Sequence, residues 1–303
     1  MKTAIVTGAN GGIGFHTALQ LAKDGVHVVL GCRDAARGND ALKKIVDQHS
    51  KASVQLANLD LSNLSSVRSF AAKFKEDNSS LDLLVNNAAV MALPERTLSA
   101  DGYEMQFATN HLGHFLLTAE LMPHLLKSSS ARIVTVSSIA HRYGKINLND
   151  LQAERNYEGW SAYGTSKLAN LLFSFELARK LKNAGNSQIS VAAHPGVAKT
   201  NILSSGPQMG RKVFRTYLSE FFSKYLAQTD AEGALPIIHA CLGPGVHNGD
   251  YYGPNGFMEL TGRPKKVESK ANALDEKMAE KLWTISESLT GAKWPWELFQ
   301  GTC

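Results

Sequence analysis

The feature that most constrains this chain is a regular alternation of short apolar runs with longer helical patterns. Repeated β–α order calls for a parallel sheet covered by helices on both faces. Continuous apolar strands are expected when both faces of such a sheet are buried. The sequence therefore predicts an α/β fold with a doubly wound parallel sheet. The expected strands span 3–8, 26–32, 53–60, 81–89, 131–138 and 188–196, and the expected helices lie near 13–24, 35–49, 62–77, 100–127 and 161–183.

Nothing resembling a linker or an internal repeat divides the 303 residues, so we expect one domain over 1–303. The alternation breaks at 198–228, where an apolar stripe at helical spacing follows the sixth strand. Ligands in open α/β sheets bind beyond the carboxyl ends of the strands. This segment is a candidate helical lid over a substrate; closing the core is the alternative. A C-terminal extension over about 254–303 follows a short strand candidate at 249–253 and contains a helix near 275–290.

Composition is that of a globular protein, with 44% hydrophobic and 19% charged residues. No uninterrupted apolar run approaches the ~18 residues that a spanning helix requires. Met1 and Lys2 lead directly into an apolar strand, which leaves no room for a signal peptide. We expect a cytoplasmic location. The three cysteines at 32, 241 and 303 are too far apart for a zinc motif or a disulfide framework and are read as free thiols.

A net charge of +5 and an isoelectric point near 9.0 could suggest a nucleic-acid partner. The Lys and Arg residues are scattered, however, and no basic run is interleaved with aromatics, so we expect no nucleic acid. A mild positive balance suits an anionic small molecule equally well. His111 and His114 form one helical pair, but no carboxylate completes a metal site, and helix packing or capping explains them.

The stretch "TGANGGIG" at 7–14 joins the first strand to the first helix. Its glycines, Gly8, Gly12 and Gly14, allow the backbone to turn tightly and approach a diphosphate. The helix that follows offers unpaired N–H groups and the positive end of its dipole. This placement between strand and helix predicts a dinucleotide site on a Rossmann-type sheet.

The end of the second strand bears on which dinucleotide is bound. An acid there takes the ribose hydroxyls of NAD, whereas an Arg receives the 2′-phosphate of NADP. Cys32 stands where the acid would be, and Arg33 follows it. Asp34 could be the acid displaced by two positions, or it could cap the next helix. We favour capping and expect NADP(H) to be preferred over NAD(H).

Tyr163 and Lys167 lie one turn apart near the start of the helix expected at 161–183. A phenol has an ordinary pKa of about 10, and a nearby positive charge lowers it. Such a Tyr can serve as a general acid or base. Taken alone, the pair is also compatible with a packed Tyr and a solvated Lys.

Taken together and in order, these motifs resemble the short-chain dehydrogenase/reductase family over most of residues 3 to about 200. Ala89 stands where the family usually has Gly. "VTVSS" offers Ser137 and Ser138 for the catalytic hydroxyl, and the family pattern places it on the second. The matching positions are Thr7, Gly8, Gly12 and Gly14 in the turn, then Asp60, Asn86, Asn87, Ala88, Asn110, Ser138, Tyr163, Lys167, Pro195, Gly196 and Thr200. Further candidate cofactor contacts are Asn10, Ile13, Arg33, Leu61 and Val197.

The resemblance implies four catalytic residues. Tyr163 would give a proton to a carbonyl oxygen, or take one from an alcohol, as hydride moves from or to the nicotinamide. Lys167 would lower the pKa of the phenol and hold the nicotinamide ribose. Ser138 would hydrogen-bond the reacting oxygen, and Asn110 would hold a water that links Lys167 to solvent.

The remaining matches imply cofactor contacts. Asp60 would face the adenine ring, and the Val197 backbone with Thr200 would hold the carboxamide. The resemblance is greatest to retinol-dehydrogenase-type carbonyl reductases, through "GCRD", "NHLGHFLLT", "SSIAHRYG" and "YGTSKLANLLF". It implies a bulky hydrophobic ketone, aldehyde or alcohol, such as a retinoid, steroid or polyketide-like molecule.

Two other functions stay open: a protochlorophyllide-type C=C reductase and a non-catalytic NADP(H)-binding sensor. A C=C reductase would need a second proton donor, and no Cys is evident near the expected site. We also expect a homodimer through the helices near 100–127 and 161–183, as is common in the family. The second of these helices has more apolar side chains than one buried face requires: Leu168, Leu171, Leu172 and Phe175.

Overall fold

One eight-stranded sheet organises the computed structural model, which describes residues 1–197 and 228–295. The strand order is β3-β2-β1-β4-β5-β6-β7-β8; neighbours from β3 to β7 pair in parallel, and β8 is antiparallel to β7. The expected doubly wound α/β fold is confirmed. The elements are β1 Thr3–Thr7, α1 Gly12–Lys23, β2 His27–Cys32, α2 Ala35–Gln48, β3 Val54–Asn58, α3 Leu64–Asp77, β4 Leu83–Asn86, α4 Met105–Phe107, η1 Ala108–Leu112, α5 Gly113–Leu125, β5 Arg132–Val136, η2 Ile139–Arg142, α6 Gly159–Asn183, β6 Ile189–Ala193, α8 Asp230–Leu242, β7 Tyr251–Pro254, η4 Phe257–Glu259, β8 Pro264–Lys266, η5 Ala271–Leu274 and α9 Glu276–Thr290.

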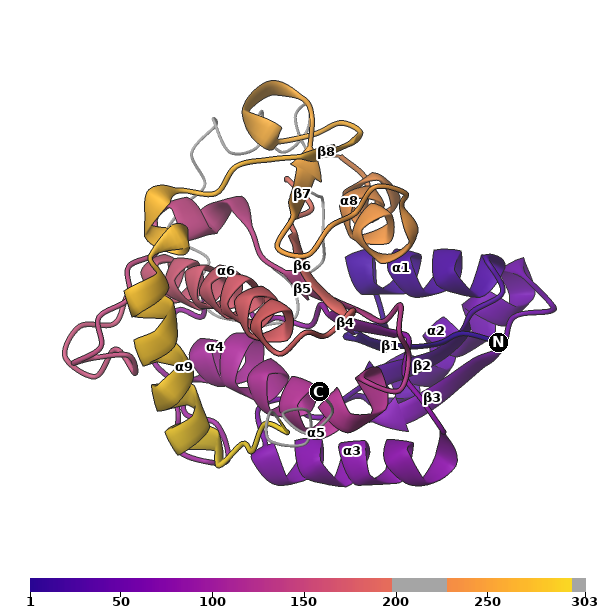
Figure 1. Cartoon of the computed structure of the whole chain (residues 1–303), viewed down its shortest axis with the longest axis horizontal. Coiled ribbons are helices and arrows are strands. Elements are labelled where there is room, and N and C mark those ends of the chain that lie inside the picture. The colour runs from indigo at the N-terminus through magenta and orange to yellow at the C-terminus, as the bar shows by residue number, and fades with distance from the viewer. Residues whose placement is uncertain (198–227, 296–303) are drawn as a thin grey trace.

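Alternate residues of each central strand supply two separate cores. In β1, Ala4 and Val6 belong to the core on the α1 and α8 face, while Ile5 belongs to the core on the α3 and α5 face. All three side chains are fully buried. Figure 1 shows the sheet between these two helical layers. Burial on both faces explains why the strands read as continuous apolar runs.

The strand order reverses between β1 and β4, which lie side by side at the centre of the sheet. In doubly wound folds the crevice at the carboxyl ends of such strands binds the ligand. The glycine turn follows β1 at this edge, and residues 87 and 88 follow β4. The topology therefore brings these motifs together, although about 80 residues separate them in the sequence.

Several details depart from the expected elements. The helix expected near 100–127 runs from 105 to 125 and contains a π-helical turn, η1. Helix α8 and strand β8 were not predicted. The proposed lid at 198–228 lies outside the described residues except for its last residue, Gln228.

Helix α9 covers the outer side of α5 and α6 (Figure 1). Leu168, Leu171 and Leu172 of α6 are at most 1% exposed, and they share a core cluster with Ala279 and Leu282 of α9. The surplus of apolar side chains that suggested a dimer is thus covered within the chain. These side chains therefore no longer support the expected dimer.

Among the described residues, no helix combines the length and apolar character that a membrane crossing would require.

We expect Trp283→Ala to destabilise the fold by about 3–5 kcal/mol, the usual cost of removing a large buried aromatic ring. Trp283 of α9 is 4% exposed, and its ring lies 5.8 Å from that of Phe173 and 5.0 Å from that of Phe115. Equilibrium unfolding in urea measures the change. Trp160→Ala, at a position that is 55% exposed, is the control and should cost far less. Equal losses in both variants would contradict this account of α9.

Candidate active site

The glycine turn between β1 and α1 is shaped for close approach of a ligand. Gly8 has φ 66°, a left-handed conformation that favours glycine. At Gly14, a Cβ atom would lie 2.4 Å from the Gly8 carbonyl oxygen, so no side chain fits there. Helix α1 begins after Gly11 with no side-chain cap and no acidic residue in its first turn. Its N–H groups are available to a phosphate, and the turn therefore fits a dinucleotide diphosphate.

The Thr7 hydroxyl connects this turn to the end of β4. It accepts hydrogen bonds from the backbone N–H groups of Asn87 at 2.8 Å and Ala88 at 2.9 Å. The Asn87 side chain donates to the Thr7 carbonyl at 2.8 Å. Ala89, where the family usually has Gly, is not among the residues with positive φ. Its methyl group is therefore compatible with the backbone at this position.

His114 extends the network from Thr7 to Asn110. Its Nδ1 lies 3.0 Å from the Asn110 carbonyl, which can only accept, so Nδ1 carries the proton. Burial lowers the pKa of His114 to about 4, so the ring is neutral and Nε2 accepts from the Thr7 hydroxyl at 2.9 Å. His111 is also buried and bonds to Ser286 at 2.9 Å. Both imidazoles thus have the packing roles that their spacing suggested.

Asp34, just after β2, has one of the two roles considered for it. Its carboxylate accepts from the Arg37 backbone N–H at 3.0 Å and caps helix α2. The capping interpretation is confirmed. Arg33 is exposed directly after the strand. The Arg37 guanidinium, which the sequence reasoning missed, lies 3.8 Å from the position that a Cβ of Gly11 would occupy. Arg37 lies three residues after the cap Asp34, on the first turn of α2. This spacing could have identified it as a second cation near the glycine turn.

Asp60 and Leu61 follow β3 at the same edge of the sheet. The Asp60 carboxylate accepts from the backbone N–H of Ser62 at 2.9 Å and from its hydroxyl at 2.6 Å, which fixes the loop. Leu61 is buried. Its carbonyl lies against Gly113 so closely that a Cβ there would be 2.3 Å away. These contacts hold the loop; an adenine contact by Asp60 stays a prediction.

Tyr163 and Ser138 come together from α6 and from the end of β5. Ser138 is the second residue after β5, and its hydroxyl accepts from the Ala140 N–H at 3.2 Å as the N-cap of η2. Its side chain also hydrogen-bonds the Tyr163 side chain. The Ser137 hydroxyl instead donates to the Lys167 carbonyl at 2.9 Å and is buried. The geometry thus places Ser138, and not Ser137, beside the phenol.

The family mechanism calls for a lowered pKa at Tyr163 beside a charged Lys167. In this structure the pKa of Tyr163 is raised and that of Lys167 is lowered. Burial raises the pKa of the Tyr163 phenol to about 12, although the hydrogen bond from Ser138 opposes the rise. Burial also lowers the pKa of Lys167 to about 7. The ammonium donates to the Val136 carbonyl at 3.1 Å and lies 5.8 Å from the centre of the Tyr163 ring. Among the protein's own groups, desolvation outweighs the expected lowering of the phenol pKa by Lys167.

Asn110 is fully buried in the π-helical turn η1. Its side chain accepts from the Val90 N–H at 2.8 Å and donates to the Val90 carbonyl at 2.9 Å. It also donates to the Ser166 hydroxyl at 2.9 Å, which lies between Tyr163 and Lys167 in α6. The side chain therefore fixes the catalytic helix to the loop after β4. The predicted water-holding role of Asn110 stays a prediction.

The Pro195–Val197 turn follows β6, and Gly196 in it has φ 69°. The Val197 N–H donates to the Leu260 carbonyl at 2.8 Å, and the Val197 carbonyl accepts from the Gln228 N–H at 3.0 Å. A carboxamide could still donate to the second lone pair of that carbonyl. Thr200 lies outside the described residues.

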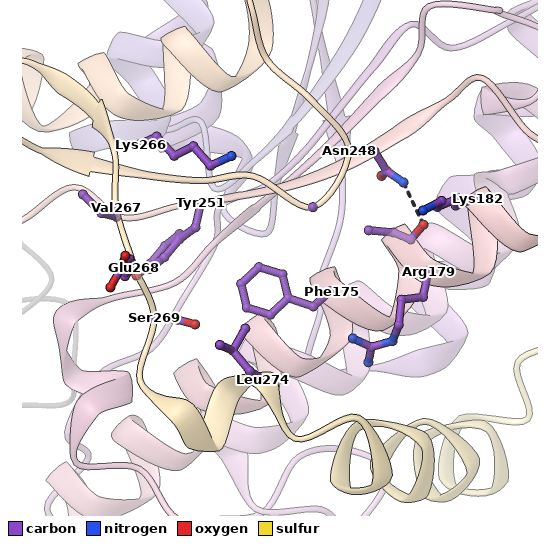
Figure 2. Close-up of a pocket in the computed structure, with 12 residues that line it drawn as sticks. Phe175, Arg179, Lys182, Asn248, Tyr251, Lys266, Val267, Glu268, Ser269 and Leu274 are labelled. Carbon is purple, nitrogen blue, oxygen red and sulfur yellow. Dashed lines mark hydrogen bonds between the residues drawn. The ribbon is translucent and has the colours of Figure 1, made fainter.

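A pocket of about 490 Å³ lies elsewhere in the described part of the chain (Figure 2). Its wall on α6 begins at Phe175, twelve residues after Tyr163, or roughly 18 Å along the helix at 1.5 Å per residue. Arg179 and Lys182 of α6 and Lys266 of β8 also line it. It is therefore separate from the catalytic residues. No group of three or more potential metal ligands occurs in the described part of the chain.

The family model described as short chain dehydrogenase matches residues 2–209. The chain belongs to this family and is an oxidoreductase acting on alcohol and carbonyl groups. It is 39% identical to retinol dehydrogenase 12 of Bos taurus over 97% of this chain and 87% of that protein. It is 40% identical to retinol dehydrogenase 13 of Mus musculus over 96% and 84% of the two chains.

A crystal structure of an uncharacterized protein from Mycobacterium Paratuberculosis shares the fold over nearly the whole length. Its TM-score is 0.79 at 38% identity, covering 97% of this chain and 95% of that one. The identities to the two retinol dehydrogenases confirm the resemblance to members of that type.

The buried ammonium predicts a pH dependence of stability. The pKa of Lys167 is about 7 in the folded chain, against an ordinary 10.5. Between these values the unfolded chain binds more protons, so the free energy of unfolding should rise with pH, by at most about 1.4 kcal/mol per pH unit. Lys167→Met should remove this rise between about pH 7 and 10. Urea unfolding without added nucleotide measures it, with exposed Lys182→Met as the control. An equal slope in the Lys167→Met variant would contradict the lowered pKa.

Proposed function

We propose that this chain transfers hydride between NADP(H) and a bulky hydrophobic ketone, aldehyde or alcohol. The observation that carries the proposal is the pairing of the Tyr163 and Ser138 side chains at the edge of the sheet where the glycine turn lies. When bound, the nicotinamide supplies or accepts the hydride. The protein's own residues orient the reacting groups and move the proton.

In this proposal Tyr163 exchanges a proton with the substrate oxygen, and Ser138 donates a hydrogen bond to the same oxygen as charge develops there. A phenol with a raised pKa holds its proton firmly. A fully protonated Lys167 would lower that pKa, because a positive charge favours the phenolate. The negative charge of a bound diphosphate would in turn favour the protonated ammonium. Lys167 would thereby become the group through which nucleotide binding prepares Tyr163 for proton transfer.

The substrate class is supported by the surface next to the phenol. Trp160 lies 6.2 Å from Tyr163, ring centre to ring centre, and is 55% exposed. Tyr143, which follows η2, is 77% exposed. The names of the relatives, retinol dehydrogenases 12 and 13, favour a retinoid-like member of this class. Turnover of retinal, a steroid ketone and a bulky polyketide-like ketone with NADPH should exceed that of a small polar ketone. Better turnover of the small ketone would contradict the proposed class.

Tyr163→Phe should reduce turnover by about 10²-fold or more, the usual contribution of general acid–base catalysis. NADPH binding should persist, because the phenol is not part of the glycine turn. Steady-state kinetics and fluorescence titration measure the two effects. The matched control is Tyr143→Phe, which removes an exposed hydroxyl and should change turnover little. Near-normal activity of the Tyr163→Phe variant would remove this residue from the mechanism.

For the cofactor, Arg33 and Arg37 both support NADP(H). Charge-assisted hydrogen bonds contribute roughly 1.5–3 kcal/mol each, and each 1.4 kcal/mol is about tenfold in affinity. NADPH should therefore be preferred over NADH by about ten- to a hundredfold, and Arg33→Ala should remove most of this gap with little loss of NADH use. The double change with Arg37→Ala should remove the rest. Exposed Arg155→Ala is the control, and equal efficiency of the unaltered chain with both cofactors would contradict the proposal.

Two alternatives remain as outcomes of the same assays. A non-catalytic sensor would bind NADPH without consuming it on any carbonyl. A C=C reductase would reduce a conjugated double bond and would need a second proton donor. Cys32 and Cys241 are both buried, and burial raises the pKa of the Cys32 thiol to about 11 and that of the Cys241 thiol to about 12. Neither thiol is suited to that step, which favours the carbonyl reaction.

Because α9 already covers the outer side of α5 and α6, we do not propose a dimer through these two helices. A cytoplasmic location stays a prediction from the sequence.

A further inference from the structure

The loop between β7 and β8, residues 255–263, is built to hold a defined shape. The Asn255 N–H donates to the Arg263 carbonyl at 2.9 Å, and the Gly256 N–H donates to the Thr261 carbonyl at 2.8 Å. At the tip, Met258 and Glu259 have φ 51° and 60°. Residues other than Gly, Asn and Asp seldom adopt this left-handed backbone conformation. Such outliers persist where the surroundings enforce them, and they cluster at functional sites.

The Glu259 carboxylate reaches from this tip to two segments of the active site. One of its oxygens, Oε2, lies 2.7 Å from Nη2 of Arg142 and 3.0 Å from Nε2 of His194. Arg142 ends η2, the short helix that Ser138 caps. His194 follows β6 and directly precedes the Pro195–Val197 turn. A single carboxylate therefore ties together the segments that carry the catalytic hydroxyl and the expected carboxamide contact.

The surroundings of the His194 ring fix one orientation, with Nε2 toward Glu259 and Nδ1 toward the Gly196 N–H. It is fully buried, and its Nδ1 accepts from the Gly196 N–H at 3.2 Å, so Nε2 carries the proton and donates to Glu259. Burial lowers the pKa of His194, which keeps the ring neutral and Nδ1 able to accept. A Cβ at Gly253 would lie 2.0 Å from Nε2, so only glycine in β7 leaves room for the ring.

Backbone contacts continue the same connection. The Leu260 carbonyl, next to Glu259, accepts from the Val197 N–H at 2.8 Å. A Cβ at Gly196 would lie 2.3 Å from that carbonyl, so the loop and the turn are in direct contact. The Gly262 N–H donates to the Gln228 side chain at 3.2 Å, and Gln228 donates to the Pro195 carbonyl. The turn is therefore fixed from one side by the β7–β8 loop.

We propose that Glu259 is a positioning residue for hydride transfer: by binding Arg142 and His194 together, it fixes the Pro195–Val197 turn relative to Ser138. The inference rests on the proposed function for the identity of the reaction. Glu259 itself touches neither Tyr163 nor the glycine turn in any described contact, so its effect acts through its two partners. A misplacement of reacting groups by about 1 Å can cost about a hundredfold in rate.

The test compares three full-length variants with the unaltered chain. Glu259→Ala removes both interactions, whereas Glu259→Gln keeps an oxygen that can accept from His194 but removes the charge that pairs with Arg142. The matched control is Glu268→Ala, an exposed carboxylate nine residues later on the same segment. Thermal unfolding first establishes that each variant is folded.

Steady-state kinetics and amide hydrogen exchange together distinguish a positioning role from a general loss of structure. In Glu259→Ala, kcat with NADPH and a hydrophobic aldehyde should fall by about ten- to a hundredfold. KM for NADPH should change by less than about threefold, because the glycine turn and the arginines lie elsewhere. Amide hydrogen exchange at Gly196 and Val197, followed by NMR without nucleotide, should become faster by about tenfold or more. Glu259→Gln should lie between Glu259→Ala and the unaltered chain, and Glu268→Ala should match the unaltered chain.

An unchanged kcat in folded Glu259→Ala would overturn the proposal, and so would unchanged exchange at Gly196 and Val197. A parallel loss in Glu268→Ala would also overturn it, since the effect would then not be specific to the carboxylate at position 259. If the unaltered chain turned over no substrate, the proposed function would fail. The exchange rates would still decide whether Glu259 fixes the turn.

Discussion

The buried hydroxyl of Thr7 is the point on which the arrangement of the active site depends. It lies at the carboxyl end of β1, where the strand order reverses, and it receives the N–H groups of Asn87 and Ala88 from the end of β4. Through the neutral ring of His114 it also reaches the carbonyl of Asn110. One side chain without charge thus joins the glycine turn, the central strand end and the π-helical turn. Because Thr7, His114 and Asn110 are buried, a lost partner would leave an unsatisfied polar atom at the centre of the site.

The sequence predicts those features of the fold and the site that depend on residues close together in the chain. Continuous apolar strands and helical periodicity predicted the parallel sheet, and the spacing of Tyr163 and Lys167 predicted a shared helix face, which α6 provides. The π-helical turn at Asn110 has no comparable signal, since its hydrogen-bond pattern depends on packing against Val90 and Ser166. Helix α8 carries a Thr229–Glu232 capping box, a pattern that is readable in the sequence and was overlooked. The apolar excess on α6 was interpreted as a dimer interface, because periodicity could not reveal that α9 of the same chain covers it.

Electrostatics was the part least accessible to spacing alone. A spacing of four positions between a phenol and an ammonium suggests that the charge lowers the phenol pKa, yet the balance depends on how deeply both groups are buried. Tyr163 is 7% exposed and Lys167 is 2% exposed, without a carboxylate among the described contacts of the ammonium. Desolvation therefore dominates both pKa values. The same reasoning applies to His114 and His194, whose burial keeps them neutral and so fixes which ring nitrogen accepts.

The C-terminal part of the chain completes a site that its N-terminal part begins. The family model ends at residue 209, and the motifs that carry the resemblance all precede that point. Yet Gly253 makes room for His194, Leu260 holds Val197, and Glu259 connects Arg142 to His194. These contacts cannot be read from motif spacing, because each joins residues at least 59 positions apart. No local pattern specifies the pairing of β6 with β7 that brings the two parts of the chain together. In three dimensions the C-terminal extension contacts the segments that carry Ser138 and Val197. A substitution in this extension would therefore alter the geometry of the candidate site without changing any residue of its motifs.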